Sequence, residues 1–314
     1  MTDLKQQARG RWRGILTSAG IDASHLTGRH CGCPACRAGK DRFRFDDKGG
    51  DGTWFCNQCL SGDGFSLLMK AKGIEFKQAC ELVRQHLGVC EPDQPRRELG
   101  DEAKRDIART VWRSAGRIQP GDLADRYLTS RHLPQRPGCL RYTDRCRYDK
   151  HGFHPAMLAQ VSDAAGVVVT VHRTYLGEHG KADVETPRKL MPGPVPPGSA
   201  VRLGPVAGAM GVAEGIETAL AASQLFGLPV WAALTAGLLE KWEPPQECRE
   251  IVILGDNDSH KQFRGEQAAY TLANRLAAKG MAVRVKVPRL PGTDWCDVLK
   301  AQRELNATEE RELA

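Results

Sequence analysis

The sequence has no long apolar run and lacks several familiar catalytic motifs. No stretch reaches the roughly 18 apolar residues of a membrane-spanning helix, which argues against a membrane protein. The first residues, MTDLKQQARGRWRG, lack the apolar stretch of a signal peptide, so we expect a cytoplasmic protein. Gly-x4-Gly-Lys-Ser/Thr is absent, which excludes a P-loop motor ATPase, and neither His-Glu-x2-His nor Gly-x-Ser-x-Gly occurs.

Aromatic residues are few, at 6%, whereas basic residues are abundant and unevenly placed. The 314 residues suffice for about two or three domains, and 41% hydrophobic residues argue against general disorder. Residues 1–150 hold 28 Lys and Arg against 19 Asp and Glu, while residues 151–314 hold 17 against 19. Arginine, which binds phosphate and stacks on bases, supplies 30 of the 45 basic residues. We therefore expect a nucleic-acid partner for the first half, although GC-rich coding would also enrich arginine.

The eleven cysteines are an odd number, and five of them lie between positions 31 and 59, unlike a disulfide framework. Two Cys-x2-Cys knuckles are separated by 19 residues, a spacing that places four thiolates around one structural Zn²⁺. The predicted ligands are Cys33, Cys36, Cys56 and Cys59. Cys31 and His30 lie just upstream, but Cys31-Gly-Cys33 has a less favourable spacing for a zinc knuckle, so neither residue is included among the predicted ligands.

Basic and aromatic residues alternate around these cysteines. The runs 41–46 and 53–55 predict two strands, preceded by a helix over 4–19 and followed by helices at 64–72 and 75–87. Basic side chains beside aromatic rings suit single-stranded nucleic acid, whose bases stack while its phosphates are neutralised. The residues expected to bind it are Lys40, Arg42, Arg44 and Trp54. Alternatively, the rings of this ribbon only form its small core.

Two proline-containing segments, 90–100 and 192–198, divide the rest of the chain. The region between them predicts helices followed by strands. After it, continuous apolar strands alternate with helices, which indicates a parallel sheet covered on both faces. We predict an α+β multidomain protein with a zinc-ribbon domain at 1–90, a basic α+β subdomain at 101–205 and an α/β parallel-sheet domain at 206–314.

Acidic residues follow several of the predicted parallel strands. Glu214 follows the first strand, Asp256 and Asp258 follow the third, and Asp294 and Asp297 follow the last. Because ligands bind beyond the carboxyl ends of such strands, we expect the carboxylates to converge on one crevice. Carboxylates without neighbouring cations repel each other unless a divalent ion binds, and oxygen ligands select Mg²⁺ or Mn²⁺, as in two-metal phosphoryl transfer. Individually, each aspartate could instead be a helix cap.

Together these motifs resemble the Toprim-type DNA primases of phages and mobile elements. The likeness is carried by KDRFRF at 40–45, TWFCNQC at 53–59, GDG at 62–64, EGIETAL at 214–220 and DND at 256–258. The chain is similar to the N-terminal primase part of satellite-phage alpha-type primase-helicases and, like the bacterial replicative primase, joins a zinc-binding domain to a Toprim catalytic core. The resemblance covers essentially the whole chain, which stops without the helicase part.

The resemblance implies a Toprim domain at 206–314, with Glu214 as its first acidic residue and Asp256 and Asp258 as its metal-binding pair. Asp294 and Asp297 would contribute later carboxylates, although two residues separate them where replicative primases commonly have one. It also implies a basic surface facing template and nucleotide. The residues at that surface are Arg173, Arg188 and Lys189, which would otherwise be solvated charges.

The implied function is synthesis of short RNA primers on single-stranded DNA from nucleoside triphosphates, with structural Zn²⁺, catalytic Mg²⁺ or Mn²⁺ and a separate replicative helicase as partner. A Toprim nuclease is one alternative, because the same metals can hydrolyse a phosphodiester. Another is a non-catalytic single-stranded-DNA-binding accessory protein. A type I topoisomerase is excluded, since 314 residues with five tyrosines leave no room for its clamp domain.

Overall fold

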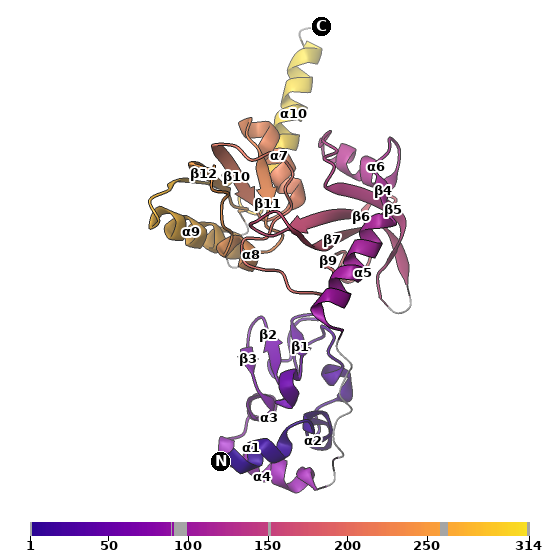
Figure 1. Cartoon of the computed structure of the whole chain (residues 1–314), viewed down its shortest axis with the longest axis vertical. Coiled ribbons are helices and arrows are strands. Elements are labelled where there is room, and N and C mark those ends of the chain that lie inside the picture. The colour runs from indigo at the N-terminus through magenta and orange to yellow at the C-terminus, as the bar shows by residue number, and fades with distance from the viewer. Residues whose placement is uncertain (1, 89, 91–98, 150–151, 258–262, 313–314) are drawn as a thin grey trace. The chain divides into compact units, whose positions relative to one another are not determined.

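The computed structural model describes residues 2–88, 90, 99–149, 152–257 and 263–312 (Figure 1). The chain divides into two compact units, Met1–Glu98 and Leu99–Ala314, which are considered separately below. Within the described ranges, no helix combines the length and apolar character that crossing a bilayer requires. The finer division of the second unit at about 205 stays a prediction.

The first unit combines short helices with an antiparallel sheet of order β1-β2-β3. Its elements are α1 (Thr2–Ala8), α2 (Trp12–Ser18), η1 (Ala23–Leu26), β1 (Phe43–Phe45), η2 (Lys48–Gly50), β2 (Trp54–Cys56), β3 (Leu60–Gly62), α3 (Gly64–Lys72) and α4 (Phe76–Leu87). The single helix expected over 4–19 is wrong, because Gly10 adopts a φ of 71° and separates α1 from α2. The helices expected at 64–72 and 75–87 are confirmed.

Aromatic rings form the centre of the first unit. Trp12, Phe43, Phe45 and Trp54 are each at most 2% exposed and belong to one hydrophobic cluster. Trp12 packs so closely on α3 that a Cβ at Gly64 would lie 2.1 Å from its ring, so only glycine fits at that position. The ribbon sheet therefore turns its aromatic face inward.

The second unit begins with an antiparallel sheet in which β4-β5-β6-β7 run in order and both β8 and β9 pair with β7. Its elements are α5 (Asp101–Arg113), β4 (Gly116–Arg117), α6 (Leu123–Ser130), β5 (Leu140–Arg147), β6 (Phe153–Ser162), β7 (Val168–Gly177), β8 (Gly180–Lys181) and β9 (Arg188–Leu190). The expected mixed α+β region is confirmed. Strand β5 was not predicted, because its sequence is mostly polar and only Leu140 and Cys146 are buried.

A four-stranded parallel sheet of order β11-β10-β12-β13 follows and confirms the predicted α/β pattern. Its elements are β10 (Ala209–Ala213), α7 (Ile216–Phe226), β11 (Val230–Ala232), α8 (Ala236–Glu240), β12 (Glu250–Leu254), α9 (Arg264–Ala277), β13 (Ala282–Lys286) and α10 (Trp295–Glu312). From β10 the chain runs to β11 on one side and then to β12 on the other, so the strand order reverses between β10 and β12. Open α/β sheets bind ligands at such a switch point.

One hydrophobic cluster joins the two sheets of the second unit. It includes Leu128 of α6, Met157 of β6, Leu220 of α7, Leu254 of β12 and Trp295 of α10. Burial of apolar surface stabilises both sheets at about 25 cal/mol per Å². The two sheets therefore pack together, and residues of the antiparallel sheet can lie close to the switch point of the parallel sheet.

Candidate active site and zinc site

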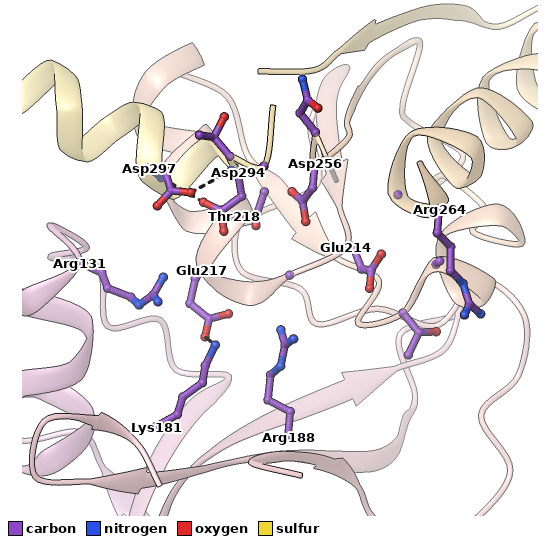
Figure 2. Close-up of a pocket in the computed structure, with 17 residues that line it drawn as sticks. Arg131, Lys181, Arg188, Glu214, Glu217, Thr218, Asp256, Arg264, Asp294 and Asp297 are labelled. Carbon is purple, nitrogen blue, oxygen red and sulfur yellow. Dashed lines mark hydrogen bonds and ion pairs between the residues drawn. The ribbon is translucent and has the colours of Figure 1, made fainter. Parts of the chain in front are cut away.

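Glu214 and Asp256 lie at the switch point of the parallel sheet. Ala213 of β10 and Leu254 of β12 are register partners, so these strands end side by side. Glu214 directly follows β10, and Asp256 follows β12 after Gly255. Both carboxylates line a pocket with a volume of about 460 Å³. Figure 2 shows them among the other residues that line it. The structure thus brings these two predicted carboxylates together, while Asp258 lies outside the described residues.

Asp294 and Asp297 line the same pocket and also cap α10. Asp294 Oδ1 accepts hydrogen bonds from the backbone N–H groups of Cys296, at 2.7 Å, and Asp297, at 3.0 Å. Asp297 Oδ2 in turn accepts one from the backbone N–H of Asp294 at 3.0 Å, which completes a capping box. Burial raises the pKa of Asp294. Their helix-cap role is therefore shown, and their catalytic role stays a prediction.

Four basic side chains line the pocket as well. They are Arg131 after α6, Lys181 at the end of β8, Arg188 at the start of β9 and Arg264 at the start of α9. Carboxylates without neighbouring cations were expected, and this is wrong, so charge repulsion alone does not require a metal. A pocket lined by both signs suits a ligand that pairs a cation with phosphates. Sequence patterns missed Arg131, Lys181 and Arg264, because they lie on elements far apart in the chain.

Glu217, in the first turn of α7, is a buried acidic residue in the pocket wall, 5% exposed. Its Oε1 accepts a hydrogen bond from the Tyr127 hydroxyl at 2.5 Å and lies 3.4 Å from Lys181 Nζ. Burial acts to raise the pKa of Glu217, but the Lys181 charge and the Tyr127 hydrogen bond outweigh it and hold the pKa at about 2. Glu217 is therefore ionised. Glu217 is not among the site residues predicted from the sequence, although it lies within the EGIETAL motif at 214–220.

The oxygen donors at the switch point fit a divalent cation in kind. Glu214 and Asp256 offer carboxylate oxygens, which Mg²⁺ and Mn²⁺ prefer. Among the described residues, no three acidic side chains bring their oxygens within 4.8 Å of one another. Mg²⁺ is commonly held by one or two carboxylates, with water and substrate phosphates completing its shell. The donor set therefore fits such an ion.

The four predicted zinc ligands form a single cluster. Their sulfur atoms all lie within 4.8 Å of one another, in the set Cys33, Cys36, Cys56 and Cys59. The distance between Cys33 Sγ and Cys59 Sγ is 3.9 Å, near the edge of about 3.8 Å that Zn–S bonds of about 2.3 Å give in a tetrahedron. Cys31 Sγ instead lies 3.6 Å from His25 Nδ1, and His30 Nδ1 lies 2.9 Å from the Asp41 carbonyl oxygen. The geometry therefore supports the four-cysteine set.

Trp54 requires a correction to the expected nucleic-acid surface. Its side chain is 2% exposed and its Nε1 donates to the backbone carbonyl of Asp63, so its ring cannot stack on a base. The alternative reading, in which the ribbon aromatics form the core, applies to Trp54, Phe43 and Phe45. Phe55 lies on the opposite face, is 41% exposed and has Arg44 as its register partner.

The other basic residues expected to bind nucleic acid differ in their surroundings, and four of the six have contacts within the protein. Arg42 donates to Gln58 Oε1 at 2.6 Å, Arg44 pairs with Asp46, and Lys40 is exposed. In the second unit, Arg173 donates to the backbone carbonyls of Arg147 and Leu190, and Lys189 lies 3.5 Å from the ring centre of Tyr148. Of the three basic residues predicted there, Arg188 lines the pocket.

Family models match three consecutive parts of the chain. Residues 28–65 match the zinc-binding domain of primase-helicase, residues 102–203 match a domain of unknown function, and residues 209–304 match the Toprim domain. The four cysteines fall within the first match, and Glu214 and Asp256 fall within the third. The chain therefore joins a zinc ribbon of the primase-helicase type to a Toprim domain.

Solved structures similar to the chain include three primase domains. A DNA primase domain from Pseudomonas aeruginosa is 15% identical, with a TM-score of 0.40 over 63% of this chain and 74% of that one. The E. coli primase catalytic core is 14% identical, with a TM-score of 0.39 over 64% and 74%. A DnaG primase catalytic domain bound to ssDNA is 18% identical, with a TM-score of 0.41 over 66% and 79%.

The zinc ribbon and the Toprim domain together confirm the predicted resemblance to Toprim-type primases. The resemblance to phage and mobile-element members in particular stays a prediction. This domain pair fits a primase function.

Proposed function

We propose that the protein is a DNA primase that synthesises short RNA primers on single-stranded DNA by nucleotidyl transfer. The observation that carries the proposal is the placement of Glu214 and Asp256 at the switch point, in one pocket with Arg131, Lys181 and Arg188. Carboxylates suit divalent cations and the basic side chains suit phosphates, so the pocket offers both halves of a metal–nucleotide substrate.

Each group has a defined part in this proposal. When bound, Mg²⁺ or Mn²⁺ would activate the attacking 3′ hydroxyl and stabilise the pyrophosphate leaving group. Asp256 would hold the metal with the predicted Asp258, and Glu214 would bind metal or assist proton transfer. Asp294 and Asp297 would add carboxylates at the rim. The cationic side chains would bind the triphosphate of the incoming nucleotide through charge-assisted hydrogen bonds.

The first unit would bind the template strand, with Phe55 and Arg44 on its exposed face. A separate replicative helicase is proposed as partner from the resemblance. Each of the eleven cysteines lies in the described part of the chain and is outside any disulfide, which fits the reducing cytoplasm that we propose as the location.

The proposal is tested by incubating the protein with labelled nucleoside triphosphates, Mg²⁺ and defined single-stranded DNA. The wild type should yield template-dependent oligoribonucleotides, and Asp256→Asn should lose them while binding the DNA normally. Glu250→Gln is a matched control, because Glu250 begins the strand β12 that Asp256 follows and pairs with Arg284 outside the pocket. Wild-type synthesis by Asp256→Asn would refute the role of this carboxylate.

The same carboxylates also fit a metal-dependent nuclease. Incubation of labelled DNA with Mg²⁺ and no nucleotides separates the two activities, because a primase leaves the DNA intact and a nuclease shortens it. Absence of both products would favour the non-catalytic DNA-binding protein.

A further inference from the structure

Glu217 differs from the other glutamate of its motif in what it contacts. Glu214 is half-buried at the strand end, whereas Glu217 is 5% exposed and accepts a hydrogen bond from Tyr127 of α6. Lys181 of β8 contacts the same Oε1 oxygen at 3.4 Å. Figure 2 shows the Lys181 side chain extended toward Glu217 at the side of the pocket away from Asp256. The contacts therefore link one residue of the Toprim domain to two residues of the region before it.

The Tyr127 ring adds contacts to this cluster. Lys181 Nζ lies 5.9 Å from the centre of the ring, and the Arg131 guanidinium carbon lies 5.4 Å from it. Cations within about 6 Å of an aromatic ring are attracted to its face. Tyr127 is 4% exposed and so holds a fixed position in the core. Glu217 and Tyr127 together thus restrict the orientation of two of the basic side chains in the pocket wall.

We infer that Glu217 and Tyr127 are positioning residues that hold Lys181 in the orientation in which it binds the triphosphate of the substrate. Lys181 has a flexible four-carbon stem, and fixing its rotamers costs conformational entropy. The buried, ionised carboxylate of Glu217 offsets that cost before the substrate binds, so Lys181 is preorganised for binding. The inference rests on the proposed function only in naming a nucleoside triphosphate as the anion.

The direction in which anion affinity changes when the Glu217 charge is removed distinguishes a positioning role from an effect of net charge. Removing a negative charge from the wall of an anion pocket should strengthen anion binding if only the net charge matters. If Glu217 acts through Lys181, its removal should weaken binding, because Lys181 loses the partner that orders it. Glu217→Gln keeps the size of the side chain and an acceptor for the Tyr127 hydroxyl, so the packing around it is retained.

The test measures binding of inorganic triphosphate to the full-length protein by titration calorimetry, which does not depend on primer synthesis. Glu217→Gln should weaken binding about tenfold, equal to about 1.4 kcal/mol. Lys181→Gln should weaken it at least as much, and Glu217→Gln should have no further effect in the Lys181→Gln background. Glu243→Gln, which removes a surface carboxylate paired with Arg275 away from the pocket, should leave binding unchanged.

Tighter or unchanged binding by Glu217→Gln, or additive effects in the double variant, would overturn the inference. Should Glu217→Gln fail to fold, Tyr127→Phe removes only the hydroxyl and should weaken binding about threefold, again with no effect when Lys181 is already replaced. In primer synthesis the same variants should raise KM for the nucleotide more than they lower kcat. A wild type that binds triphosphate but makes no primers would refute the proposed function and leave the positioning role standing.

Discussion

Burial and neighbouring groups determine the charge of two titratable residues in the second unit, Glu217 and His172. Glu217 is buried and charged because Lys181 and Tyr127 compensate its desolvation, so the carboxylate is stable without facing solvent. His172 of β7 is also buried, at 7% exposed, but its ring Nδ1 lacks a hydrogen bond within the described residues that would stabilise a charge.

His172 should make the stability of the second unit depend on pH. Burial is the largest cause and lowers the pKa of His172 to about 4, although the Glu217 carboxylate acts to raise it; the charges of Arg188, Arg173 and Lys181 lower it further. Between about pH 6.5 and pH 4 the unfolded chain therefore takes up a proton that the folded chain does not, and stability falls as the pH falls. The loss attributable to this group is about 3 kcal/mol.

Urea unfolding of the wild type and of His172→Gln at pH 7 and pH 4.5 measures this difference. The variant has no titrating group at this position, so it should lose less stability than the wild type over the same interval. Equal losses in the two proteins would show that the protonation of His172 does not contribute.

Within the ribbon sheet, strand alternation decides which side chains are exposed and which are buried. Cys56 must face inward to reach the zinc site, and Trp54 lies two residues earlier on the same strand, so it shares that face. Phe55 lies between them and faces outward. The alternation of side chains along β2 therefore indicates that Trp54 is a core residue. The presence of aromatic residues beside basic ones, on which the nucleic-acid prediction rested, does not distinguish a buried ring from an exposed one.

Phe55→Ala should weaken binding of single-stranded DNA about tenfold, because stacking on one base contributes about 1–3 kcal/mol. Phe76→Ala is a matched control, since Phe76 of α4 is 42% exposed, almost the same as the 41% of Phe55. Fluorescence anisotropy with a labelled oligonucleotide compares the two variants. Equal effects of the two substitutions, or none for Phe55→Ala, would place the DNA contact elsewhere.

For the whole molecule, two folding units with different sources of stability are expected to unfold separately. The first unit has a small core and a four-cysteine zinc site, whereas the second is stabilised by hydrophobic clusters that span two sheets. Binding of a structural zinc ion is coupled to the folding of the domain that holds it. Loss of zinc should therefore affect the first unit far more than the second.

Cys56→Ser should reduce the zinc content from one ion per chain to none and remove hydrogen-exchange protection from residues of the first unit. Protection in the parallel sheet around β10 and β12 should stay as in the wild type. Metal analysis and exchange mass spectrometry on the same sample report both results. Stoichiometric zinc in the variant would show that the ligand set is wrong.

The sequence predicts those features that depend on local spacing. Paired Cys-x2-Cys knuckles and continuous apolar strands gave the zinc site and the parallel sheet, and strand ends located Glu214 and Asp256. The remaining pocket residues depend on tertiary packing, since Tyr127 and Lys181 reach Glu217 from two other elements. No spacing rule connects positions on α6, β8 and α7, and for that reason the positioning cluster emerges only from the structure.

We propose that Glu214 and Asp256 share a divalent ion at the switch point of the Toprim domain. The most direct measurement is the anomalous difference map of a crystal of this protein grown with Mn²⁺ and a nucleoside triphosphate. We expect a manganese peak with oxygen atoms of both carboxylates and of the phosphates within about 2.2 Å. A map with no such peak, or with manganese bound elsewhere while the nucleotide occupies the pocket, would contradict this proposal.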